Sequence, residues 1–191
     1  ELKPHHVSIA VTDMDLAIDW YQSVLGFTLE RRFHAAGIPA DGAFLRRPEL
    51  RLELWCAAGV KPVPAERQVP DSDLRTAGTK HVAFTVPNLQ SHLPGLLARG
   101  VELAGVQRVP AEPMRPDPDV LAPGKPPVFA VFIRDPFGTL IELLDPARLP
   151  APSSSDRSGS SPATACGAAV TKSRCRHAPS ACSRRSRRGR A

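Results

Sequence analysis

Two histidines and two glutamates occupy matching places in an internal repeat of the sequence. His6 opens the segment His-Val-Ser-Ile-Ala-Val, and His81 opens the similar segment His-Val-Ala-Phe-Thr-Val. Glu53 lies in Leu-Glu-Leu and Glu142 in Ile-Glu-Leu, each near the end of its copy. Two imidazoles and two carboxylates form a donor set suited to a borderline or hard divalent metal ion. If a pseudo-symmetric fold unites the two copies, the repeat predicts a metal site.

Each of these four residues also has a purely structural explanation. Glu53 shares a predicted strand face with Arg51 and Trp55, so it could simply be solvated. Glu142 has the apolar neighbours Leu140 and Leu144 on its own face, which makes that explanation weaker. A lone histidine at the start of a strand is more often structural than a ligand. The matched positions of all four residues favour the metal site.

The other histidines fit the pattern less well. His5 is the rival of His6, but the repeat aligns His5 with Lys80 and His6 with His81. His34 and His92 have no counterpart in the other copy. We therefore leave these three residues out of the predicted ligand set.

The elements of the first copy follow from its apolar pattern. Residues 12–15 have the form of a capping box, and a helix with the stripe Leu16, Trp20 and Val24 follows and ends at Gly26. Alternation in the histidine segment places His6 on the same face as the small residues that follow it. We expect further strands over residues 27–33, 43–47 and 50–56.

The second copy repeats this order. Its helix contains Pro94, which predicts a late start or a kink, and ends at Gly100. The segment from Asp135 to Gly138 reads Asp-Pro-Phe-Gly, which is typical of a type I turn. The copy is longer because of a proline-rich segment, Pro110 to Pro127, which is either a lid or specificity wall or an ordinary surface loop. We expect its strands at residues 81–86, 101–109, 128–133 and 139–144.

The chain divides sharply in charge and composition. Residues 1–148 contain sixteen Lys and Arg against eighteen Asp and Glu, whereas residues 149–191 contain nine against one. Beyond Pro150 the only large aliphatic side chain is Val170, too little apolar surface to offset the entropy of ordering. We interpret residues 149–191 as a disordered basic tail. Its arginine run has no interleaved aromatic residues, so we expect no nucleic acid partner.

The cysteines and the hydropathy indicate the compartment. Cys56 lies in the first copy, and the three tail cysteines have no zinc-binding spacing. Neither an apolar signal segment nor a run of apolar residues long enough for a membrane span is present. We expect a cytoplasmic, reduced protein without a membrane partner.

The motifs quoted above, together with Asp-Pro-Phe-Gly-Thr-Leu-Ile-Glu-Leu-Leu near the end of the second copy, resemble the vicinal oxygen chelate superfamily. The resemblance covers residues 5 to 146 and implies an α+β fold in which two paired βαβββ modules form a cupped mixed sheet around a metal site. Module one is residues 5–57 and module two is residues 79–146, within a domain of residues 1–148. It also implies a homodimer and one divalent ion (Ni, Co, Mn, Zn or Fe) bound by His6, Glu53, His81 and Glu142.

The superfamily includes several activities, and departures from each branch narrow the choice. Metal-free drug-binding proteins lack the ligands, and extradiol dioxygenases use two His and one Glu. Bacterial glyoxalase I has the same ligands but carries glutathione-binding Arg and Asn residues where this chain has Ala10 and Ala57. The opening segment resembles the epimerases, although Glu53 replaces a glutamine usual in the methylmalonyl-CoA enzymes.

We therefore expect a metal-dependent epimerase or isomerase that moves a proton beside the ketone of a small hydroxy-carbonyl substrate, such as a sugar-like or cyclitol ketone or an acyl-CoA. Glu142 is the expected base and Glu53 the second acid or base. A glyoxalase I-type lyase is the first alternative. A non-catalytic drug- or metabolite-binding protein and an extradiol-type dioxygenase follow.

Overall fold

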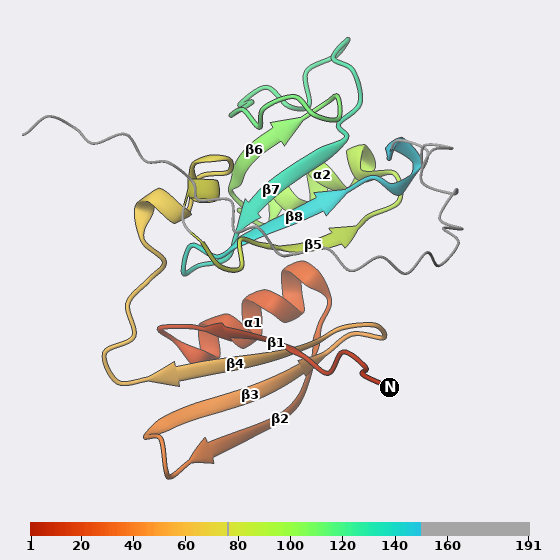
Figure 1. Cartoon of the computed structure of the whole chain (residues 1–191). Helices are drawn as coiled ribbons and strands as arrows, with labels where there is room; N and C mark the ends of the chain where they lie inside the picture. The colour runs from red at the N-terminus through yellow and green to blue at the C-terminus, as the bar shows by residue number, and fades with distance from the viewer. Residues whose placement is uncertain (76, 150–191) are drawn as a thin grey trace, which may run out of the picture. The chain divides into compact units, whose positions relative to one another are not determined.

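The computed structural model describes residues 1–75 and 77–149, which form two copies of one β-α-β-β-β unit (Figure 1). Module one contains β1 (Val7–Ala10), α1 (Met14–Leu25), β2 (Thr28–Ala35), β3 (Ala40–Arg46) and β4 (Arg51–Ala57). Module two contains β5 (Val82–Thr85), α2 (Leu89–Ala98), β6 (Leu103–Gln107), β7 (Ala130–Arg134) and β8 (Leu140–Leu144). Short 3₁₀ helices occur at Ala65–Arg67, Ser72–Arg75 and Pro146–Arg148. The predicted tail lies outside the described residues, except for Leu149.

Each module builds one four-stranded mixed sheet. The strand order is β1-β4-β3-β2 in module one and β5-β8-β7-β6 in module two. The first strand of each module runs parallel to the last, and the other neighbours are antiparallel. The α+β class and the paired βαβββ modules are confirmed.

The core side of both sheets follows the two-residue period of the strands. Leu52 and Leu54 of β4, and Ile141 and Leu143 of β8, are buried in one apolar cluster that extends through both modules. The ring of Phe27 meets that of Phe84 edge-on at 6.1 Å between ring centroids. The opposite face of each sheet carries the glutamate of its last strand, Glu53 or Glu142, beside a phenylalanine of the neighbouring strand.

Helix α1 differs from its sequence prediction at its start and on its buried face. The Asp13 carboxylate accepts a hydrogen bond from the Leu16 amide at 2.9 Å, so Asp13 and not Thr12 caps the helix. The buried residues are Ala17, Ile18, Tyr21 and Leu25. Leu16 of the predicted stripe is 48% exposed, because a strict four-residue spacing drifts about 40° per step around a helix. The predicted end at Gly26, with φ 67°, is confirmed.

Helix α2 accommodates its proline. It starts at Leu89 and continues through Pro94, so the predicted late start is wrong. Asn88 precedes it in the left-handed region without a capping side-chain bond. The predicted turn before β8 is confirmed, since the Gly138 amide donates to the Asp135 carbonyl at 3.1 Å.

The segment between the modules lies against module two. The Val63 amide donates to the Phe137 carbonyl at 2.9 Å, and the Arg134 guanidinium donates to the Gln68 carbonyl at 2.8 Å. In the proline-rich loop, Arg115 pairs with Val106, and the Met114 amide donates to the Asp71 carboxylate at 3.1 Å. Both segments thus contact one another beside β6. None of the helices described in residues 1–75 and 77–149 is long and apolar enough to cross a membrane.

Candidate functional site

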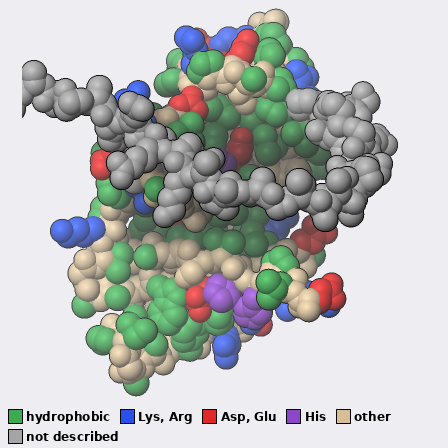
Figure 2. All heavy atoms as spheres, in the orientation of Figure 1, with side chains coloured by type: hydrophobic (Ala, Val, Ile, Leu, Met, Phe, Trp, Pro, Cys, Tyr) green, Lys and Arg blue, Asp and Glu red, His purple; other side chains and the backbone are tan. Residues whose placement is uncertain are grey.

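The sheet register brings the first predicted pair together. Ser8 of β1 lies opposite Glu53 of β4, and His6 immediately precedes β1 on the same face. His6 Nε2 lies 3.1 Å from Glu53 Oε2, with the two side chains 31% and 15% exposed. Figure 2 shows histidine side chains beside hydrophobic ones on the face of this module that points to the viewer. The first pair is therefore only partly exposed, on the sheet face away from the core.

The second pair repeats this arrangement. Ala83 lies opposite Glu142, in the place that Ser8 and Glu53 take in module one. His81 Nε2 lies 3.1 Å from Glu142 Oε2, and the two side chains are 32% and 17% exposed. A cavity of about 180 Å³ borders His81, and its lining includes Ser8, Thr79 and Leu140. The repeat thus produces two His–Glu pairs with the same geometry.

An aromatic ring backs each pair, and the sequence reasoning missed both rings. Phe44 lies opposite Glu53, and its ring meets that of His6 edge-on at 5.7 Å. Phe132 lies opposite Glu142, and its ring meets that of His81 at 4.9 Å. The sequence signal that could have indicated them is the phenylalanine in the strand that precedes each glutamate-bearing strand. These rings hold the imidazoles in place and reduce the water around them.

The distance within each pair suits a shared cation. Two ligand atoms that each lie about 2.1 Å from one ion, at a right angle, are about 3.0 Å apart. The observed 3.1 Å therefore allows each nitrogen and oxygen to bind one ion together. Imidazole and carboxylate donors also match the divalent ions predicted from the sequence.

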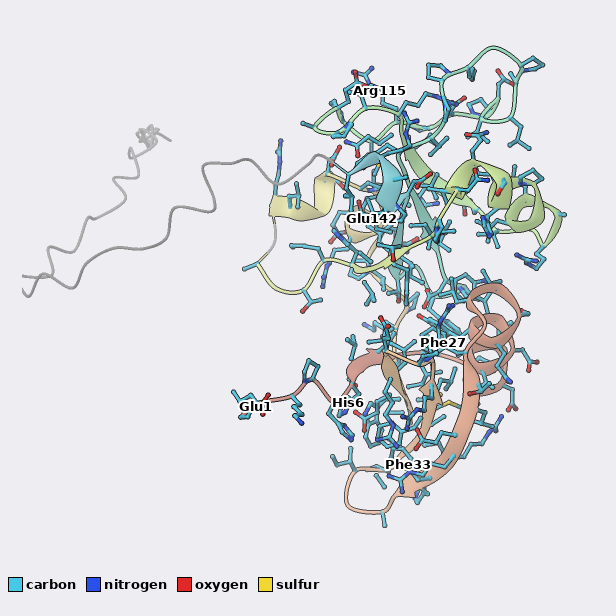
Figure 3. The ribbon with its side chains drawn as sticks, turned by 90° about the vertical axis from the view of Figure 1, so that its right-hand side faces the viewer. Glu1, His6, Phe27, Phe33, Arg115 and Glu142 are labelled. Atoms are coloured by element: carbon cyan, nitrogen blue, oxygen red, sulfur yellow. The ribbon has the colours of Figure 1, made fainter. Side chains whose placement is uncertain are left out.

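The four predicted ligands do not form one cluster within the chain. Across residues 1–75 and 77–149, no group of three or more His, Cys, Asp or Glu side chains could hold a metal ion. Figure 3 labels His6 in module one and Glu142 in module two, on separate sheets. The four predicted ligands thus lie as two separate His–Glu pairs, one on each module.

His5, which was left out of the predicted ligand set, contacts the first pair from behind. Its Nδ1 lies 2.7 Å from His6 Nδ1, and the Arg51 guanidinium donates to its Nε2 at 2.9 Å. Because arginine can only donate, the hydrogen bonds run from Arg51 through His5 and His6 to Glu53. A cation on His6 Nε2 would require the His6 hydrogen on Nδ1, which would make His5 Nδ1 the acceptor, place the His5 hydrogen on Nε2 and break the bond from Arg51. In the observed arrangement His5 thus contacts the His6 ring and holds its orientation.

The similarity to known proteins spans both modules. Residues 3–143 match the family model described as the Glyoxalase/Bleomycin resistance protein/Dioxygenase superfamily. A glyoxalase family protein from Enterococcus faecalis has a similar structure, with a TM-score of 0.56 and 20% identity over 75% of this chain and 97% of that chain. No curated protein matches the sequence significantly.

Two further solved structures share the fold. A glyoxalase family protein from Bacillus cereus gives a TM-score of 0.53 and 24% identity over 76% of this chain and 94% of that chain. The trypanothione-dependent glyoxalase I of Leishmania major gives 0.50 and 23% over 73% of this chain and 84% of that chain. At these identities the likeness extends to the fold alone.

Proposed function

Because the chain belongs to the glyoxalase, bleomycin resistance protein and dioxygenase superfamily, we propose that it is a divalent-metal-dependent epimerase or isomerase. Its reaction moves a proton at the carbon beside the ketone of a small hydroxy-carbonyl substrate. The observation that carries the proposal is the pair of equal half-sites, in which histidine and glutamate lie 3.1 Å apart at repeat-equivalent positions.

The complete site requires a second copy of the chain. One half-site supplies only two protein ligands, which is too few for a catalytic metal site, where three or four are usual. A symmetric homodimer that apposes His6 and Glu53 of one copy with His81 and Glu142 of the other would supply four. Those four side chains would hold the ion and leave it open to the two oxygens of the substrate. Nickel, cobalt, manganese, zinc and iron all suit this donor set.

The two glutamates then have distinct chemical tasks. When bound, the cation would polarise the substrate carbonyl and make the neighbouring C–H bond more acidic. Glu142 takes that proton, and Glu53 acts as the second acid or base, returning a proton to the opposite face or to the neighbouring carbon. Both carboxylates are mostly shielded from water, as their 15% and 17% exposures show, which strengthens their interaction with a developing charge.

A glyoxalase I-type lyase is the second candidate, because it uses the same four ligands. Two positions on module one favour the epimerase instead. Ala10 lies opposite Trp55 on the exposed side of β1, and Ala57 ends β4. Neither side chain can hold the carboxylate or amide groups of glutathione by hydrogen bonds. Turnover of methylglyoxal with glutathione would reverse this preference.

Hydrogen exchange with deuterated solvent tests the proposed reaction. We expect the metal-loaded protein to exchange the α-hydrogens of small hydroxy ketones or 2-oxo acids, and Glu142→Gln to lose about 100-fold or more of that rate. Glu49→Gln is the control, because Glu49 is exposed in the turn before β4. Absence of exchange with nickel, cobalt, manganese, zinc and iron alike would refute the epimerase proposal.

A further inference from the structure

Three aromatic side chains form a platform beside the first half-site. The Phe33 ring stacks on Phe44 at 5.4 Å and 26°, and Trp55 meets Phe33 edge-on at 5.1 Å. Gly42 makes this possible, because a Cβ at that position would lie 2.3 Å from the Phe33 ring. We call Phe33, Phe44 and Trp55 the aromatic platform.

Two guanidinium groups lie on this platform, and they differ in their partners. Arg51 lies 4.3 Å from the centroid of Phe44 and forms two hydrogen bonds to the Glu30 carboxylate, at 2.7 and 2.5 Å. Arg31 lies 5.0 Å from Phe44 and 5.6 Å from Phe33. Among residues 1–75 and 77–149, Arg31 has these ring contacts but no carboxylate or hydrogen-bond partner. One positive charge of the platform is therefore neutralised by Glu30, and the other is not.

The position of Arg31 relates it directly to the first half-site. Arg31 pairs with Phe44 across β2 and β3, and Phe44 pairs with Glu53 across β3 and β4. Arg31 and Glu53 are thus two strands apart in one row, or about 10 Å between Cα atoms. The long arginine side chain can span part of that distance. The substrate oxygen would bind the cation that Glu53 helps to hold. An anionic group two or three carbons beyond that oxygen would then reach the Arg31 guanidinium.

Module two has no arginine at the position equivalent to Arg31. Gly105 occupies the position opposite Phe132 that Arg31 occupies opposite Phe44. A Cβ on Gly105 would lie 3.1 Å from Met114 and 3.4 Å from Pro70, so this row is covered by apolar side chains. The cationic platform is therefore particular to module one, and its asymmetry would orient a substrate with one charged end.

We propose that Arg31 binds a carboxylate of the substrate, so that the enzyme acts on oxo or hydroxy acids whose carboxylate lies two or three carbons beyond the chelating carbonyl. This rests on the proposed function for the chelating end alone. A single unpaired guanidinium matches the one charge and the planar, two-oxygen geometry of a carboxylate. The rings of Phe33 and Phe44 lie 5.6 and 5.0 Å from the guanidinium carbon and exclude water from that side of it.

Calorimetric titration of the metal-free full-length chain tests the anion site by itself. The probes are glutarate and its uncharged diamide, glutaramide. We expect glutarate to bind about 10-fold more tightly or better, and Arg31→Gln to abolish that preference. Arg32→Gln is the matched control, because Arg32 is the next residue of β2 and pairs with Asp15 instead. Trp55 fluorescence in a Trp20→Phe background should respond to glutarate, since Trp55 is then the only tryptophan.

Three outcomes would overturn the inference. The first is equal affinity for glutarate and glutaramide, and the second is an equal loss of glutarate affinity in the Arg31→Gln and Arg32→Gln variants. The third is a change of oligomeric state in Arg31→Gln without loss of glutarate binding. The chelating end is tested separately with manganese(II) and 2-oxoglutarate. If manganese does not improve 2-oxoglutarate binding while the glutarate preference persists, the proposed function fails and the anion site stands.

Discussion

The Tyr21 hydroxyl donates a hydrogen bond to Asp135 Oδ2 at 3.0 Å, although 114 residues separate the two positions. Tyr21 lies on the buried face of α1 in module one, and Asp135 lies in the turn before β8 in module two. The amides of Phe137 and Thr139 donate to the other carboxylate oxygen at 3.0 and 2.7 Å. This buried bond therefore ties the first helix to the turn that leads into the strand of Glu142.

Tyr21→Phe should lower the free energy of unfolding by about 1–3 kcal/mol, because the buried Asp135 oxygen loses its donor while the ring is kept. Urea denaturation followed by circular dichroism measures this change. Ser23→Ala on the exposed side of α1 is the control and should change stability by less than about 0.5 kcal/mol. An unchanged unfolding midpoint in Tyr21→Phe would show that the bond contributes nothing.

The ionisation of Tyr21 should be delayed until the protein unfolds. Burial first, and then the charge of Asp135, raise the pKa of the Tyr21 phenol well above 10.0. In the unfolded chain the phenol ionises near pH 10.0. The contribution of Tyr21 to stability is therefore fully present below that pH and is lost as the pH rises towards the folded-state pKa. Tyr21 is the only tyrosine, so tyrosinate absorbance reports it alone. Tyrosinate should appear together with unfolding, and its appearance in the folded state near pH 10 would contradict this.

The carboxyl of Asp135 should also stabilise the folded state more at lower pH, in this case in the acidic range. Burial raises its pKa above 3.8, although hydrogen bonds from Thr139, Phe137 and Tyr21 act against that rise. The folded state thus binds the proton more tightly than the unfolded state does, and this contribution fades as the pH rises through the folded-state pKa. Relative to Asp135→Asn, the native chain should be most stable at low pH. A stability difference that grows with pH, measured by urea denaturation, would contradict this sign.

The repeat made most of the fold predictable, because each element predicted in one copy had a counterpart in the other. The strands, the end of α1 at Gly26 and the repeat-equivalent positions of the two histidines and two glutamates follow from residue spacing within a module. The Tyr21–Asp135 bond could not be predicted in this way, because it joins positions that no local pattern relates. The positions of Phe44 and Phe132 beside the two His–Glu pairs were not predicted for a different reason. Where nearly all residues of a strand are apolar, the sequence does not show which of them share a face with the glutamate.

The platform glycine provides a test of close packing. Gly42→Ala should destabilise the protein by about 1–3 kcal/mol, because the new Cβ would displace the Phe33 ring that lies 2.3 Å from it. Adding Phe33→Leu should recover part of the loss, so that the two changes are not additive. Gly37→Ala is the control, because a Cβ there meets nothing within 4 Å. Additive losses in the thermal unfolding of the double variant would exclude the clash as the cause.

The proline-rich loop is held together at its base by one carboxylate. Asp117 accepts from Arg108 at 2.7 Å and from Lys125 at 2.5 Å. Hydrogen bonds from Lys125 and Arg108 lower the pKa of Asp117 below 3.8, so its contribution is present above that pH and is lost as the pH falls through the folded-state value.

Asp117→Asn should therefore speed amide hydrogen exchange within the loop by about 10-fold at neutral pH and much less at acidic pH. Asp119→Asn, at an exposed position in the same loop, is the control and should change exchange little. Equal exchange in the two variants would show that the ion pairs do not order the loop.

The two half-sites make a specific prediction about mixed dimers. If one site takes its first pair from one copy and its second pair from the other, a dimer of His6→Ala with His81→Ala contains one intact site and one site that lacks both histidines. Each variant alone should bind manganese(II) poorly. After co-expression, random pairing makes half of the dimers mixed, so the pool should bind about one quarter of the metal that the native protein binds.

Co-expression of His6→Ala with Glu53→Ala is the matched control. Both residues belong to the first pair, so every mixed dimer lacks an intact first half-site and no binding should return. Manganese binding, measured by electron paramagnetic resonance, reports the result without any substrate. If the first mixture binds no more metal than its parents do, the half-sites do not combine across chains, and the proposed four-ligand site is wrong.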